Sequence, residues 1–174
     1  MENFLVDSIV NRSREMIQEG MSTQKILTYL AFAAEDIMGG EAVCSILVLD
    51  NDGLLRNGAS PRLPIDYLAA IDGLKPSPLV GSCAAAAATG SIVITSNFLD
   101  DDKWVELRHL PIALGFAGAW SVPIKREDST VLGTFGTYYR EKKVPRQQDI
   151  DVISALAGAA AHVLKAGQQI RFAQ

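Results

Sequence analysis

The tight-turn sequence Asn51-Asp52-Gly53 is the feature that most constrains the fold of this chain. It follows the short, apolar and β-branched run from Val43 to Asp50, and the run from Leu54 to Gly58 begins directly after it. Asparagine, aspartate and glycine accept the backbone angles of a hairpin turn, so the two runs are predicted to pair as antiparallel strands.

A second pair of strands is predicted nearer the C-terminus. The apolar runs from Ala117 to Ile124 and from Leu132 to Tyr139 are joined by the polar segment from Lys125 to Thr130. Their length and this polar connection favour an antiparallel pair, and short hairpins in general favour an antiparallel sheet.

Helical patterns flank the strands at both ends of the chain. A first helix is predicted from Phe4 to about Gln18, where Gly20 interrupts it. Ser22 suits the N-cap of a second helix because its hydroxyl can accept a free first-turn N–H, and Gly39-Gly40 ends that helix. A last helix begins near Arg146. The second and last helices each carry one apolar stripe at helical spacing: Ile26, Leu27, Leu30, Ala33, Ala34 and Ile37, then Ile150, Ile153, Leu156, Ala157, Ala160, Val163 and Leu164.

The middle of the chain is irregular and rich in proline. Four short elements are predicted within it. They are helical turns from Ile65 to Ile71 ending at Gly73, a helix from Cys83 to Ala88 between Gly81-Ser82 and Gly90, a strand from Ser91 to Ser96, and a helix from Trp104 to His109 that Pro111 interrupts.

This order of elements predicts an α/β fold of the α+β kind. A central antiparallel sheet carries the N- and C-terminal helices together on one face, and the irregular middle covers the other face. The length of 174 residues suits one domain over residues 1–174, with a core at about 22–164 and flanking helical extensions at 1–20 and 165–174.

Charge and cysteine content narrow the function classes. The formal net charge of −4 argues against nucleic acid as a partner, which requires a basic face. No basic stripe marks a membrane surface, and Glu2 and Asp7 stand where a signal peptide would carry bases, so a cytoplasmic protein is expected. Cys44 and Cys83 form neither a disulfide framework nor a metal-site spacing.

Several short motifs occur in order along the chain, and together they resemble the GAF domains of bacterial two-component sensors and cyclic-di-nucleotide enzymes. The resemblance extends from about Ser22 to Leu164. It implies the GAF fold and a sensory role with a small-molecule ligand and a downstream signalling domain or kinase, but it identifies no ligand and no cofactor. The motifs are Cys44 to Asp50, Gly58-Ala59-Ser60-Pro61, Gly81-Ser82-Cys83, Trp104, Leu114-Gly115-Phe116, Ala119 to Ile124 and Val131 to Phe135.

The chain also departs from related GAF domains. The run from Ala84 to Ala88 replaces the Gly-Thr-Ala-Ala that follows the cysteine in many relatives. The motif of cyclic-nucleotide-binding GAF domains, expected near Tyr139 to Asp149, is absent, as is the Cys-His pair that holds a bilin. The resemblance therefore assigns no known ligand.

The candidate ligand site lies on the sheet face away from the long helices, against the segment from Gly81 to Phe116. Free N–H groups after Gly81 can meet an anionic group, although a simple N-cap is the more ordinary role for Ser82. Trp104 and Trp120 offer flat surfaces with one N–H donor each, and both are also ordinary core residues. The predicted ligand-binding residues are Ser82, Cys83, Ala86, Trp104, His109, Trp120 and Ser121, with no catalytic or metal-ligating residue assigned.

Other functions for the same fold remain open. Cys83 at a helix N-terminus could be a redox sensor, or a buried and inert thiol. Its turn also resembles that of free methionine sulfoxide reductases, which would need partner cysteines near Gly73 and Ile112; the chain has neither, and a disulfide relay needs a second thiol within reach. A non-enzymatic domain is therefore predicted. A ligand-free dimerisation module is a further alternative, which the small residues Gly81, Ala84 to Ala88 and Gly118 disfavour.

A homodimer is predicted through the terminal helices. One side of the last helix is expected to form a seam that a single sheet does not fully cover, and paired helices would bury it. The residues of this seam are Ile150, Ile153, Ala157, Ala160 and Leu164.

Overall fold

Five strands form one antiparallel sheet in the order β2-β1-β5-β4-β3. The computed structural model describes the backbone of residues 2–173 and the side chains of residues 3–168. Both predicted strand pairs are confirmed, and all four pairings are antiparallel. The strands are β1 (Ala42–Leu49), β2 (Leu55–Ala59), β3 (Val93–Thr95), β4 (Gly118–Lys125) and β5 (Val131–Tyr139).

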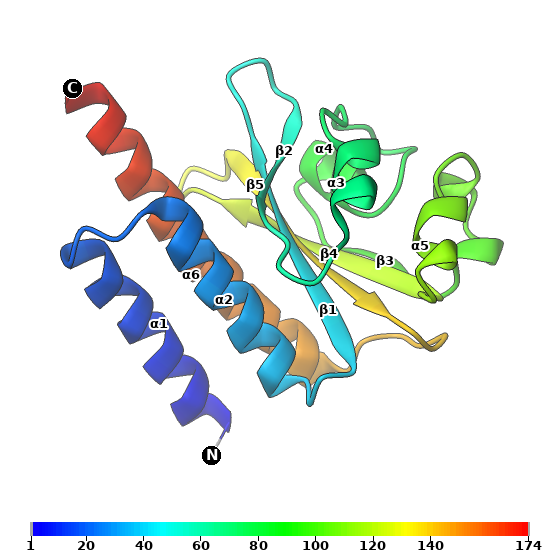
Figure 1. The fold of residues 1–174 in the computed structure, drawn as a ribbon, viewed down its shortest axis with the longest axis horizontal. Helices are drawn as coiled ribbons and strands as arrows, with labels where there is room; N and C mark the ends of the chain where they lie inside the picture. The colour runs from blue at the N-terminus through cyan, green and yellow to red at the C-terminus, as the bar shows by residue number, and fades with distance from the viewer. Residues whose placement is uncertain (1, 174) are drawn as a thin grey trace.

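The three long helices lie together on one face of this sheet, as predicted (Figure 1). They are α1 (Glu2–Gln18), α2 (Thr23–Ile37) and α6 (Gln147–Ala173). The helices α2 and α6 contact the strands, and α1 packs outside them. Ser22 caps α2 as expected, since its Oγ accepts the N–H of Lys25 at 3.3 Å. Together α1, α2 and α6 make up the helix layer.

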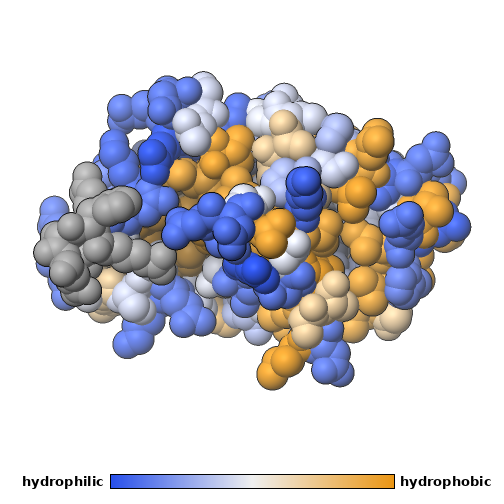
Figure 2. Space-filling view, turned by 90° about the horizontal axis from the view of Figure 1, so that it is seen from above, coloured by the Kyte–Doolittle hydropathy of each residue, from blue (hydrophilic) through white to orange (hydrophobic). Residues whose placement is uncertain are grey.

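The opposite face is covered by the segments on either side of β3, residues 61–92 and 96–117, here called the cover (Figure 1). Figure 2 shows apolar surface over the half of the molecule that holds it. The cover contains α3 (Ile65–Ile71), α4 (Cys83–Thr89), the 3-10 turns η1 (Phe98–Asp100) and η2 (Asp102–Trp104), and α5 (His109–Ala113). The predicted ends of α3 and α4 are confirmed, since Gly73 and Gly90 both adopt positive φ, which glycine tolerates best.

One predicted element of this region is present but shorter than expected, and another is wrong. The strand expected from Ser91 to Ser96 has only three residues. The helix expected from Trp104 to His109 instead begins at His109, after the η2 turn, and Pro111 lies inside it as its third residue. The first residues of a helix have no intrahelical partner for their N–H groups, so a proline there breaks no hydrogen bond.

The predicted dimer seam on α6 is also wrong, because this chain covers those residues itself. Ile153, Ala157, Ala160 and Leu164 are buried in the core between the sheet and the helix layer, and Ile150 is half-buried against the same core. Over Gln147–Gln168, α6 is long and apolar enough to cross a membrane by length and composition, and 44% of this window is buried within the domain.

A buried carboxylate joins the helix layer to the start of the cover. Glu35 of α2 is fully buried, and its Oε1 accepts the Cys44 N–H at 2.9 Å. Its Oε2 pairs with Arg62 Nε at 2.8 Å, around the β2 edge of the sheet. Burial raises the pKa of Glu35, while the Cys44 N–H and the Arg62 charge act in the opposite direction.

Replacement of Glu35 tests this junction. A raised pKa means that the folded state holds the proton more tightly, so this carboxyl's contribution to stability is lost as pH rises through the folded-state pKa. Glu35→Gln keeps an acceptor for the Cys44 N–H, and its free energy of unfolding should depend less on pH than that of the wild type. Glu35→Ala leaves the Cys44 N–H unpaired and should cost about 2 kcal/mol.

Urea denaturation between about pH 4 and 8 measures both effects. Glu127→Gln, in the exposed turn between β4 and β5, is the matched control and should leave stability nearly unchanged. The same pH dependence in wild type and Glu35→Gln would contradict the assignment.

Candidate functional site

A small cavity of about 30 Å³ lies between the sheet and the cover. Its sheet wall comes from Leu47 and Leu55, together with Tyr138 of β5. The remaining walls come from the cover and are mostly apolar: Tyr67, Ile71, Leu74, Val80, Gly81, Ser82, Cys83, Ala84, Trp104, Leu107 and Leu110. This volume exceeds the roughly 10–15 Å³ that a cavity needs in order to hold one water molecule.

Three of the predicted ligand-binding residues line this cavity: Ser82, Cys83 and Trp104. Two more are buried nearby without lining it. Ala86 is fully buried in α4, and the Oγ of Ser121 lies 3.3 Å from the Cys83 Sγ, behind the cavity wall. The segment from Gly81 to Phe116, in which the ligand site was predicted, therefore contributes part of the cavity wall.

Trp120 and His109 do not line the cavity, which corrects the prediction for both. Side chains alternate along β4, so Trp120 joins Val122 and Ile124 in the core beneath the helix layer, whereas Ala119 and Ser121 face the cover. His109 is exposed at the start of α5, where Pro111 is the residue that turns inward.

A pair of tyrosines at the cavity was not predicted. The hydroxyl groups of Tyr67 and Tyr138 are 2.7 Å apart, and their rings meet edge to face with centroids 5.9 Å apart. Burial raises the pKa of both hydroxyls, so both keep their protons at neutral pH. One proton joins the two oxygens, which leaves the other O–H able to donate to a ligand. Strand alternation could have identified Tyr138 from the sequence, because it places Tyr138 on the same face of the sheet as Gly136.

The Cys83 side chain lies directly against β5, at a position where the strand has a glycine, Gly136. A Cβ atom added at Gly136 of β5 would lie 2.9 Å from the Cys83 Sγ, a distance at which something must shift. Burial raises the pKa of the Cys83 thiol, against the opposing effect of the Ser121 hydroxyl. The thiol is therefore neutral near pH 7, whereas redox chemistry requires the thiolate.

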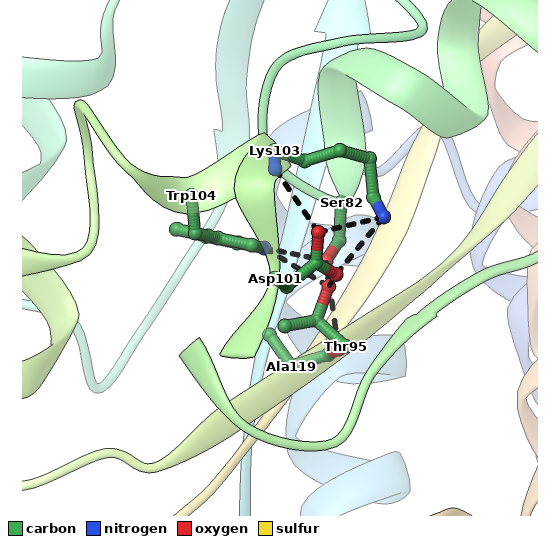
Figure 3. Close-up of polar contacts among 6 residues, drawn as sticks. All are labelled: Ser82, Thr95, Asp101, Lys103, Trp104 and Ala119. Atoms are coloured by element: carbon green, nitrogen blue, oxygen red, sulfur yellow. Dashed lines mark hydrogen bonds and ion pairs between the residues drawn. The ribbon is translucent and has the colours of Figure 1, made fainter. Parts of the chain in front are cut away.

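A polar network fastens the cover to the edge of the sheet (Figure 3). The Trp104 Nε1–H donates to the hydroxyl oxygens of Ser82 at 3.2 Å and Thr95 at 3.1 Å. The Thr95 hydroxyl in turn donates to Asp101 at 2.6 Å. The Ser82 side chain therefore points to Thr95 and makes no N-cap hydrogen bond, which corrects the simple N-cap interpretation.

Asp101 is the charged member of this network. Its carboxylate accepts the Lys103 N–H at 3.0 Å and pairs with Lys103 Nζ at 2.8 Å. Burial acts to raise its pKa, but the hydrogen bonds from Lys103 and Thr95 outweigh it and hold the pKa of Asp101 below its usual value. The network is thus intact at neutral pH and weakens as pH falls through that lowered pKa.

Comparison with known proteins agrees with this architecture. A family profile described as the GAF domain matches residues 20–165. Because this range is most of the chain, the chain belongs to the GAF domain family.

Individual relatives include sensors and an enzyme. The chain is 32% identical over 165 residues to a methyl sulfide methyltransferase-associated sensor of Methanosarcina acetivorans, covering 92% of this chain but only 16% of that protein. It is similar to a structure assigned to a two-component sensor histidine kinase of Sinorhizobium meliloti (TM-score 0.63, 22% identity, 80% of this chain and 90% of that chain). It is also similar to free methionine-R-sulfoxide reductase of Neisseria meningitidis in complex with its substrate (TM-score 0.75, 14% identity, 98% and 92%). At these identities the two structures show the fold alone.

Enlarging Gly136 tests the contact that seats α4 on the sheet. Gly136→Ala should lower the free energy of unfolding by about 1–3 kcal/mol, because the new methyl group overlaps the Cys83 sulfur. In a Cys83→Ala background the same substitution should cost clearly less, since the sulfur is gone. A double-mutant cycle by chemical denaturation measures the difference.

Gly158→Ala is the control, because no atom lies within 4 Å of a Cβ at that helical position. It should stabilise the domain by up to about 1 kcal/mol. Equal costs of Gly136→Ala in the two backgrounds would contradict the proposed overlap.

Proposed function

We propose that this chain is a cytoplasmic sensory domain that binds a small molecule in the cavity between the sheet and the cover. One observation carries the proposal: the lining of the cavity is mostly apolar but includes Tyr67 and Tyr138, whose hydroxyl groups are hydrogen-bonded to each other. Small-molecule sites typically combine apolar lining with a few convergent polar groups. The names of the sensor relatives support a sensory role.

The lining favours a ligand with a compact apolar body and one hydrogen-bond acceptor. The free tyrosine O–H would meet that acceptor, and the apolar walls contributed by Leu47, Ile71 and Leu110 would contact the body. A ligand of several heavy atoms exceeds about 30 Å³, so binding requires the cavity to widen. The strands of the sheet wall are held by their pairing with neighbouring strands, and we therefore expect the cover to move.

The route to the helix layer would pass through β5. Tyr138 lines the cavity, while its neighbour Tyr139 faces the opposite side and contacts Trp120 in the core beneath the helices. A displacement of β5 would therefore shift α6, because α6 packs on β4 and β5. We propose that α1 and α6 pass the change to a downstream signalling domain or kinase of a two-component or related system, in a homodimer without nucleic acid or membrane as a partner.

A sulfoxide reductase-like activity is the competing proposal, since one structural neighbour has it. Reductive relay chemistry needs a second thiol within reach of the first. The chain has two cysteines, and the sheet separates them: Cys44 faces the helix layer and Cys83 faces the cover. Both are free thiols. We therefore propose a non-enzymatic role.

Native mass spectrometry of protein purified from its own cells tests the ligand proposal. Wild type should carry a bound small molecule. Ala84→Val should lose that added mass, because Ala84 lines the cavity and two further carbon atoms would fill it.

Ala88→Val is the matched control, since Ala88 is an exposed residue of the same helix, and it should retain the molecule. Wild type without any added mass, or Ala84→Val with the same added mass as wild type, would favour a ligand-free dimerisation module or a different site.

A further inference from the structure

On the exposed side of α6, residues at equal distances before and after Gly158 match one another in charge or size. Asp151 lies seven positions before this glycine and Lys165 seven positions after it, and both are exposed. Ser154 and His162 lie four positions before and after it and are also exposed. Near the centre the side chains are small, with Ala155 and Ala161 three positions to either side.

The space around Gly158 is open. Apart from the adjoining backbone of α6, no atom of the described residues lies within 4 Å of a Cβ built there. Beside it runs a groove of about 520 Å³ between α6 and the β3 edge of the sheet, with Val122 in its floor and Ile92 at its rim. Ile92 is 40% exposed and Ile94 of β3 is 37% exposed. An open small-residue surface therefore adjoins apolar side chains that are partly exposed.

We propose that a second copy of this chain docks here, with the two α6 helices antiparallel and crossing at Gly158. In that arrangement residues at equal distances on opposite sides of the crossing meet, so Asp151 of each copy faces Lys165 of the other. One two-fold interface thus contains two opposite-charge pairs. The small side chains let the helices approach closely, and the groove next to Gly158 receives the flank of the partner helix.

The charges favour the antiparallel arrangement over the parallel alternative. In a parallel pair Asp151 would face Asp151 and Lys165 would face Lys165, which places like charges together at both ends. This interface uses the side of α6 opposite the buried seam predicted from the sequence. It specifies the homodimer of the proposed function but needs no ligand, so ligand-free protein can test it.

Light scattering and sedimentation over a concentration series measure the association of ligand-free protein. Gly158→Arg should raise the dimer dissociation constant at least about tenfold, because a long side chain cannot fit at the crossing. Ser8→Arg, on the exposed side of α1, is the control and should associate like the wild type. Thermal unfolding confirms that both variants are folded.

Charge exchange tests the pairing. Asp151→Lys and Lys165→Asp should each weaken the dimer by about fivefold at low salt, and the double variant should return to within about twofold of wild type. A parallel dimer would keep its like-charge contacts in all of these variants and show no such rescue.

Disulfide trapping tests the direction of the helices. A mixture of the Ser154→Cys and His162→Cys variants should form a crosslinked dimer on mild oxidation, whereas each alone should not. In the antiparallel pair identical positions are offset by eight residues, about 12 Å along the axis, beyond disulfide reach. Crosslinking of each variant alone, a wild type that stays monomeric, or a Gly158→Arg variant that dimerises normally would overturn the proposal.

Discussion

The close contact between Cys83 and Gly136 sets the spacing between the sheet and the cover. Because Gly136 has no side chain, the first turn of α4 can rest directly on the centre of the sheet. The small residues that follow in α4 keep this helix close along its length, and four of them are buried. The cavity lies beside this contact, so its depth depends on a position where even a methyl group does not fit.

The two faces of the sheet have different roles, which follow from strand alternation. The face toward the helix layer is packed with large apolar side chains such as Trp120, Ile124 and Phe135. The face toward the cover combines small and polar residues, including Ser45, Ser121 and Thr134, all fully buried. The first face stabilises the domain, and the second leaves space and polar groups next to the cavity. Glu35 and Arg62 join the two around the β2 edge, so the cover is anchored both at its start and at the Thr95–Asp101 network.

The sequence predicted the elements that depend on local chemistry. Three local signals each specify the structure of the residues around them: the Asn51-Asp52-Gly53 turn, the Ser22 cap and the apolar stripe of α6. The prediction of an antiparallel sheet followed from signals of this kind. Features that depend on distant contacts were missed. Trp120 could belong to either face until the register of β4 was known, Ser82 bonds to a threonine on another element, and Tyr67 meets Tyr138 across 71 positions of chain. No local pattern carries such information.

Hydrogen–deuterium exchange tests most directly whether the cavity communicates with the helix layer. The comparison is between protein that carries the small molecule from its own cells and the same protein after that molecule is removed. Bound protein should show slower exchange in the cover around α3, α4 and η2, in β5, and in the part of α6 that packs on β4 and β5. Identical exchange in the cover of the two samples, or slower exchange in the cover with no change in β5 and α6, would contradict the account.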